Sequence, residues 1–152
     1  MRDVVFEWYV PYTLNRRQQL IKALMVSAAL VFFVDAVFFA AAMLFLSLIL
    51  AVAGFFLFRS WKYEYEYVYV NGDFTISKII RKAKRKDVYH AFRPDFQEIA
   101  PGRKEIPGCR SRDFTSGREK APVYTIRCRG ELIYIEAEED FIAEMKKYYS
   151  IG

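Results

Sequence analysis

The strongest feature of the hydrophobic pattern is an apolar run from Leu20 to Phe58, whose only charge beyond its first turn is Asp35. A transmembrane helix needs about 20 apolar residues to cross roughly 30 Å of hydrocarbon. The run has 39 residues, so a single helix would overshoot the bilayer. The pattern therefore predicts a membrane α-helical hairpin, with helices at about 17–36 and 40–60 and a turn between 34 and 42.

Basic residues lie at both ends of this predicted helical segment, residues 17–60, whereas its central turn carries none. They are Arg16, Arg17 and Lys22 at the entry and Arg59 and Lys62 at the exit. Loops on the cytoplasmic side of membrane helices carry an excess of Lys and Arg. We therefore expect a multi-pass protein of the cytoplasmic membrane with both termini in the cytoplasm, and Asp35 near the outer turn.

Aromatic residues flank the apolar run as well. They are Trp8, Tyr9 and Tyr12 before it, and Trp61, Tyr63 and Tyr65 after it. Amphipathic rings of this kind gather at the level of the lipid headgroups. We therefore expect residues 1–16 to form a cytoplasmic or interfacial segment.

From Trp61 onward the apolar run gives way to strict alternation. Tyrosines at 63, 65, 67 and 69 fall on one face, which is the pattern of a half-buried strand. Asn71-Gly72 follows, and a type I′ turn needs the positive φ that these two residue types tolerate. The pattern predicts a hairpin whose second strand covers residues 73–80.

The rest of residues 61–152, the expected cytoplasmic domain, also has strand and turn signals. We expect strands at 88–92 and 96–100 around a turn at 93–95, a loop at 101–122 with one short strand near Phe114, and a hairpin of 123–129 with 132–137.

A C-terminal helix is predicted after these strands. Its first turn holds the acidic residues 138–140 and its last turn Lys146 and Lys147, as the helix dipole favours. An apolar stripe at helical spacing, Phe141 to Tyr149, requires a sheet face to cover. The expected fold class is thus a helical hairpin plus a mainly-β domain of six or seven antiparallel strands, capped by this helix.

Such a layout is typical of a pleckstrin-homology-like (PH-like) barrel or sandwich. Three stretches add a family resemblance: Phe6-Glu7-Trp8-Tyr9-Val10, Tyr63-Glu64-Tyr65-Glu66-Tyr67 with Asn71-Gly72-Asp73-Phe74, and Ile79-Ile80-Arg81-Lys82-Ala83-Lys84-Arg85-Lys86. With the helical hairpin between them, they resemble a family of small, uncharacterised bacterial membrane proteins with a PH-like cytosolic domain, common in clostridia and their relatives. The resemblance implies this fold and a bacterial inner-membrane location. It implies no active-site residues.

The net charge of +5 is too small to indicate nucleic-acid binding by itself. The densest charge is a basic cluster: Lys78, Arg81, Lys82, Lys84, Arg85 and Lys86. Clustered cations bind phosphates and are attracted to anionic lipid. The cluster is therefore the candidate binding site for a lipid headgroup or a partner, although a solvated connection between two strands would have the same composition.

The residues for catalysis or metal binding are sparse. A structural zinc site needs four ligands in short paired spacings, whereas Cys109 and Cys128 lie 19 positions apart and His90 is the sole histidine. We expect partly buried, free thiols in a reducing cytosol, and His90 as a hydrogen-bonded core residue on the face of Val88 and Phe92. We expect no cofactor, no metal and no enzyme activity.

Two functions of different classes follow from these observations. One is a membrane-anchored interaction module that docks a protein partner or a membrane complex at the cytoplasmic face. The other is binding of acidic lipid headgroups through the basic cluster. An accessory subunit of a membrane transporter is a third possibility. Membrane lipids and a protein partner are the expected partners, and nucleic acid is not.

Overall fold

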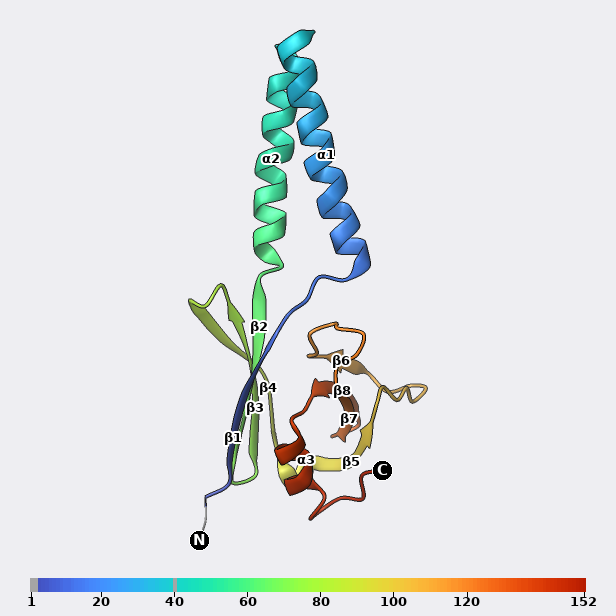
Figure 1. Ribbon diagram of the computed structural model, residues 1–152. Helices are drawn as coiled ribbons and strands as arrows, with labels where there is room; N and C mark the ends of the chain where they lie inside the picture. The colour runs from blue at the N-terminus through green and yellow to red at the C-terminus, as the bar shows by residue number, and fades with distance from the viewer. Residues whose placement is uncertain (1–2, 40) are drawn as a thin grey trace. The chain divides into compact units, whose positions relative to one another are not determined.

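The structure is a computed structural model that describes residues 3–39 and 41–152. The chain divides into two compact units (Figure 1). A β unit combines Met1–Thr13 with Tyr63–Gly152, and a helical unit comprises Leu14–Lys62. The helical unit is thus an insertion within the sequence of the β unit.

The helical unit contains two helices, α1 (Arg16–Phe38) and α2 (Ala42–Ser60), that run side by side (Figure 1). Asn15 caps α1, because its side chain accepts a hydrogen bond from Gln18 N at 2.9 Å and the Gln18 side chain accepts one from Asn15 N at 3.1 Å. Both helices are long and apolar enough to cross a membrane, which confirms the predicted pair.

Asp35 lies in the last turn of α1, where its carbonyl accepts a hydrogen bond from Phe39 N at 2.8 Å. This position agrees with the expectation that Asp35 lies close to the turn between the helices. Ala40, inside the predicted turn, is outside the described residues. Because α1 ends at Phe38 and α2 begins at Ala42, the connection between the helices falls inside the predicted range of 34–42.

The first sheet of the β unit is antiparallel. Its order is β1 (Val5–Pro11), β2 (Tyr63–Val70), β3 (Asp73–Ile80) and β4 (Lys84–Phe92). Asn71 and Gly72 have φ values of 50° and 99°, so the predicted type I′ turn joins β2 to β3. The tyrosine face is buried as predicted, with Tyr67 and Tyr69 almost fully covered.

The second sheet follows a short 3-10 turn, η1 (Arg93–Asp95). Its order is β5 (Phe96–Pro101), β7 (Val123–Cys128), β8 (Glu131–Glu136) and β6 (Ser111–Asp113). The short strand β6 runs parallel to β8 and so departs from the all-antiparallel expectation. The long loop after β5 lets the chain turn back, so that β6 enters the sheet in the same direction as β8.

The C-terminal helix α3 (Glu139–Met145) is shorter than predicted. After Met145 the backbone tightens into turns, with Tyr148 N and Tyr149 N both bonded to the Met145 carbonyl. Phe141 is fully buried among the rings of Phe6, Trp8, Tyr69 and Phe74. The helix thus caps the tyrosine face, as the predicted fold class requires.

The N-terminal segment departs from its predicted interfacial role. Trp8 is only 5% exposed, stacks on Tyr67 with ring centroids 5.1 Å apart, and donates from Nε1 to the Glu136 carbonyl at 2.8 Å. The expectation that Trp8 lies at headgroup level was wrong, because strand β1 buries it in the domain core. The predicted domain boundary at residue 61 therefore excludes β1 from the unit to which it belongs.

His90 also differs from its expected place in the core. Tyr89 and Ala91 face the core, whereas His90 is exposed and its Nε2 lies 2.8 Å from Asp73 Oδ1. The cause is the register of β4: Tyr89 and Ala91 pair with the buried Ile76 and Phe74, so the residue between them points outward. His90 instead pairs with a carboxylate on the outer face.

Candidate functional site

The basic cluster is centred on the turn between β3 and β4. Ala83 N donates to the Ile80 carbonyl at 3.2 Å, and both central residues, Arg81 and Lys82, have a φ of 56°. Non-glycine residues rarely adopt this left-handed conformation, and it costs roughly 1 kcal/mol or more for each. Two long cations therefore occupy a turn that Asn-Gly would form with less strain.

A β-bulge divides the cluster between the two faces of the sheet. Ile76 pairs with Tyr89 and Ser77 with Asp87, so Val88 is the extra residue of β4. Beyond the bulge Lys78 faces Lys86, and Ile80 faces Lys84. Directly opposed residues share a face; consequently Lys84 and Lys86 lie on the tyrosine face with Lys78.

Lys78 continues the aromatic surface of that face. Its Nζ lies 3.8 Å from the centroid of the Tyr63 ring. The rings of Tyr12 and Tyr63 stack with their centroids 4.5 Å apart. Burial raises the pKa of Tyr63 above its ordinary value, so this phenol stays neutral at physiological pH. The result is an ammonium group held over the neutral aromatic ring of Tyr63.

Arg85 lies on the opposite face and is already ion-paired. Its Nη2 lies 2.8 Å from Oε2 of the buried Glu66, and its Nε lies 3.4 Å from Ser77 Oγ. Tyr9 also donates to Glu66, at 3.0 Å. Because a buried carboxylate needs its partner, Arg85 is held in place and separated from the other cations of the predicted cluster.

The remaining cations, Lys78, Arg81, Lys82, Lys84 and Lys86, are here called the basic tip. Four of them are exposed and Lys78 is partly buried. Within residues 3–39 and 41–152, no carboxylate lies within ion-pair distance of these five groups. The basic tip is thus uncompensated positive charge that is free to meet an anion.

Few residues of the sequence separate the end of α2 from the strand that leads to the basic tip. Tyr63 follows Ser60 by three residues and pairs with Ile80, which pairs with Lys84.

A second polar cluster surrounds Glu136, which is buried in β8. Its carboxylate accepts from Ser116 N at 2.8 Å, from Ser116 Oγ, and from Arg118 Nη2 at 3.1 Å. All of these bonds are internal, and they close the loop before β7. We interpret this cluster as structural; no sequence spacing points to it, because its members meet only through the sheet.

Asp113, at the end of β6, anchors the same loop region. Burial alone would raise the pKa of its carboxyl group, but hydrogen bonds from Arg103 and Thr115 outweigh burial and lower the pKa below its ordinary value. Arg103 Nη1 lies 2.6 Å from Asp113 Oδ2. These contacts fix the long connection that sequence reasoning could only describe as a loop.

The cysteines and acidic residues form no further site in the described ranges. Cys128 is buried in the core and Cys109 is half-buried, and both are free thiols. Burial raises the pKa of the Cys128 thiol, so it stays protonated. No group of three or more His, Cys, Asp or Glu side chains is arranged to hold a metal ion in the part of the chain that the structure describes.

Comparisons with known proteins concern the whole chain. No curated protein and no solved structure matches it significantly. The model of a family described as "Bacterial PH-like domain (DUF6106)" matches residues 2–151. This match covers both helices and every strand described above, and it confirms the resemblance inferred from the sequence. The chain therefore belongs to the DUF6106 family of bacterial PH-like domains.

Proposed function

We propose that this protein is a membrane-anchored PH-like domain whose basic tip binds anionic phospholipid headgroups at the cytoplasmic face of the bacterial cytoplasmic membrane. The proposed role is one of binding and requires no bond-making chemistry. The observation that carries it is the uncompensated charge of the basic tip, on the hairpin that pairs with β2, the strand that follows α2 in the sequence.

The energetics of lipid contact favour this arrangement. Each Lys or Arg close to an anionic membrane surface contributes about 1 kcal/mol, within roughly a Debye length of 8–10 Å. Five such groups together supply several kcal/mol. The helical anchor removes most of the entropic cost of association, because it keeps the domain at the surface permanently. A modest charge cluster is therefore sufficient.

The strand pairing supports a two-span topology. Pro11 in β1 pairs with Glu64 in β2, so the residues just before α1 and just after α2 belong to one sheet. A membrane cannot pass between two hydrogen-bonded strands; if the helices span it, both ends of the hairpin lie on the same side. The basic flanks Arg16, Arg17, Arg59 and Lys62 favour the cytoplasmic side.

A topology reporter tests this arrangement in living cells. An enzyme that is active only in the periplasm is expected to be silent when fused after Gly152, because two spans return the chain to the cytoplasm. The control fusion is placed after Phe39, behind α1 alone, and should be active. Strong activity after Gly152 would overturn the proposed orientation.

Hydrogen exchange of the full-length protein in lipid nanodiscs tests the lipid contact. In anionic nanodiscs, the amides of residues 78–86 should exchange about threefold more slowly, or slower still, than in zwitterionic ones. Salt near 1 M, where the Debye length is roughly 3 Å, should remove the difference. The double substitution Lys82→Glu/Lys84→Glu should remove it as well.

The matched control reverses two exposed lysines outside the basic tip, Lys120→Glu/Lys146→Glu. This variant has the same net charge as the test variant and should keep the effect of anionic lipid. Equal exchange of residues 78–86 in both kinds of nanodisc would rule out lipid binding by the basic tip.

Protein docking is a second candidate, favoured by a different surface. Val5, Val70 and Phe92 lie in one row across the outer face of the first sheet, with Asp73 between Val70 and Phe92, and are 56%, 38% and 48% exposed. Apolar side chains grouped on a solvent-facing sheet are typical of an interaction surface. If the nanodisc experiment shows no effect of lipid charge, this row becomes the leading binding surface.

A further inference from the structure

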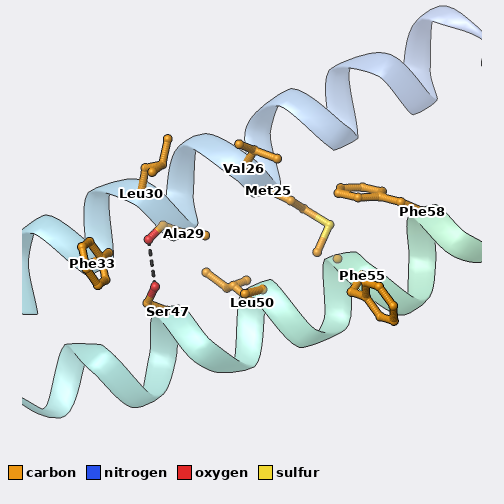
Figure 2. Close-up of a pocket in the computed structure, with 11 residues that line it drawn as sticks. Met25, Val26, Ala29, Leu30, Phe33, Ser47, Leu50, Phe55 and Phe58 are labelled. Atoms are coloured by element: carbon orange, nitrogen blue, oxygen red, sulfur yellow. Dashed lines mark hydrogen bonds between the residues drawn. The ribbon is translucent and has the colours of Figure 1, made fainter.

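We propose that the groove between α1 and α2 binds one acyl chain of an anionic phospholipid, whose phosphate is held by Lys22 and Arg59. The inference rests on the membrane location proposed above and concerns a site separate from the basic tip. The groove has a volume of about 410 Å³, within the range of small-molecule sites in proteins. Its lining includes Met25, Ala29, Ser47, Phe55 and Phe58 (Figure 2), and also Ala51.

Local packing explains why the groove is open. Ser47 Oγ donates to the Ala29 carbonyl at 2.9 Å and ties the helices together at one point (Figure 2). Gly54 is buried, and a Cβ atom there would lie 3.4 Å from the Phe58 ring. Small residues on this face leave space that the larger side chains at its edges enclose only partly.

The lining indicates hydrocarbon as the occupant. Among the described residues that line the groove, Ser47 is the only one with a polar side chain, and its hydroxyl hydrogen is already used in the bond to Ala29. A polar ligand would therefore lose its hydrogen bonds to water without replacement, which is costly. An acyl chain forms no hydrogen bonds to water and therefore loses none in the groove.

Two cations at one end of the groove indicate the headgroup. Lys22 Nζ lies 5.7 Å from the centroid of the Phe58 ring, and the guanidinium carbon of Arg59 lies 5.7 Å from that of Phe55. Both rings line the groove, and the cations come from different helices. Among the described residues neither cation forms an ion pair with a carboxylate.

This combination of charge and apolar lining selects one class of ligand. A phospholipid joins an acyl chain to a phosphate, and Lys and Arg are suited to phosphate. A third helix in the groove, from a second copy for example, would fill the apolar space but leave both cations without a partner. Anionic lipids carry more negative charge than zwitterionic ones and should be preferred.

Native mass spectrometry of the full-length protein in mild detergent tests the site. The probes are phosphatidylglycerol and phosphatidylcholine with identical acyl chains, added in equal amounts. We expect about one retained lipid per chain and about a tenfold preference for phosphatidylglycerol, as two nearby cations would give. Equal retention of the two lipids would overturn the proposed headgroup contact.

Matched substitutions on α2 locate the bound lipid. Ala51→Leu fills the groove and should reduce retained phosphatidylglycerol about fivefold or more. Ala53→Leu makes the same change two residues away, outside the lining, and should leave retention unchanged. Circular dichroism of both variants checks that the helices still form. Equal retention of phosphatidylglycerol by the two folded variants would overturn the site. So would a dimer that holds no lipid and that Ala51→Leu dissociates.

Two further variants separate this site from the basic tip. Lys22→Gln/Arg59→Gln should abolish the preference for phosphatidylglycerol while retaining some lipid of both kinds. Lys82→Glu/Lys84→Glu should not change lipid retention in detergent, although it should remove the exchange protection in nanodiscs. A loss of retained lipid in the Lys82→Glu/Lys84→Glu variant would show that the basic tip, and not the groove, holds the lipid.

Discussion

A chain of residues 61–152, which lacks β1, is expected to fail to fold. Trp8 and Val10 contribute buried side chains from β1, and Trp8 also bonds to the Glu136 carbonyl. Loss of a large buried side chain alone costs about 3–5 kcal/mol, out of a total stability of about 5–15 kcal/mol. Removal of the strand also exposes the ladder edge of β2 and part of the aromatic core.

The test compares four chains by circular dichroism and urea denaturation: residues 61–152, a joined chain that keeps β1, and two variants of the joined chain. Residues 1–13 joined to 63–152 by a short Asn-Gly linker should fold, because β1 and β2 are adjacent and antiparallel. In this joined chain Trp8→Ala should cost about 3–5 kcal/mol. Val5→Ala, at an exposed position of the same strand, should cost less than about 1 kcal/mol. Cooperative unfolding of 61–152 at the midpoint of the joined chain would contradict the role assigned to β1.

The second large effect is expected from Phe141→Ala in α3. Phe141 is fully buried, with ring centroids of Trp8, Tyr69 and Phe74 at 5.1, 5.4 and 5.8 Å. The substitution leaves a cavity at the point where three strands and the helix meet. We expect a loss of about 3–5 kcal/mol, which corresponds to a fall in Tm of roughly 15 °C or more for a domain of this size.

Phe92→Ala provides the matched control, because it makes the same chemical change at a side chain that is 48% exposed. Its cost should stay below about 1 kcal/mol. Thermal unfolding of the joined chain, followed by circular dichroism, measures both variants. Similar Tm values for Phe141→Ala and Phe92→Ala would show that α3 does not cap the core as described.

Local signals predicted the parts of this fold whose partners are close in the sequence. Asn71-Gly72 and Arg129-Gly130 both adopt paired positive φ values at the hairpins expected there. Alternating tyrosines correctly marked the buried face of β2. The length of the apolar run predicted two helices, because the thickness of the bilayer sets the length of a membrane helix. In each of these cases, a few adjacent residues determine the structure.

Elements with distant partners were harder to predict. Val5–Pro11 pairs with residues more than fifty positions later, beyond the helical segment, and its amphipathic aromatics fit an interfacial segment equally well. The parallel pairing of β6 with β8 likewise depends on a long loop. The exposure of His90 depends on which face of β4 meets the core, a choice that the sequence of the strand leaves nearly balanced.

The basic cluster could be found from composition, but the division of its cations between the two faces of the sheet could not. A single bulge residue, Val88, decides that Lys84 and Lys86 share the tyrosine face while Arg85 turns toward Glu66. Neither the Lys78–Tyr63 contact nor the groove between the helices leaves a recognisable spacing in the sequence. Both depend on register and helix contact, which are tertiary properties.

The insertion of the helical unit between β1 and β2 also sets an order of events during synthesis. β1 leaves the ribosome first, but its partner strand exists only after Leu14–Lys62 has been made. At roughly 5–20 residues per second, this interval lasts several seconds. If the helices insert into a membrane as proposed above, their insertion can therefore precede folding of the domain. During that interval, the unpaired first strand exposes Trp8 and its neighbours and needs protection from aggregation.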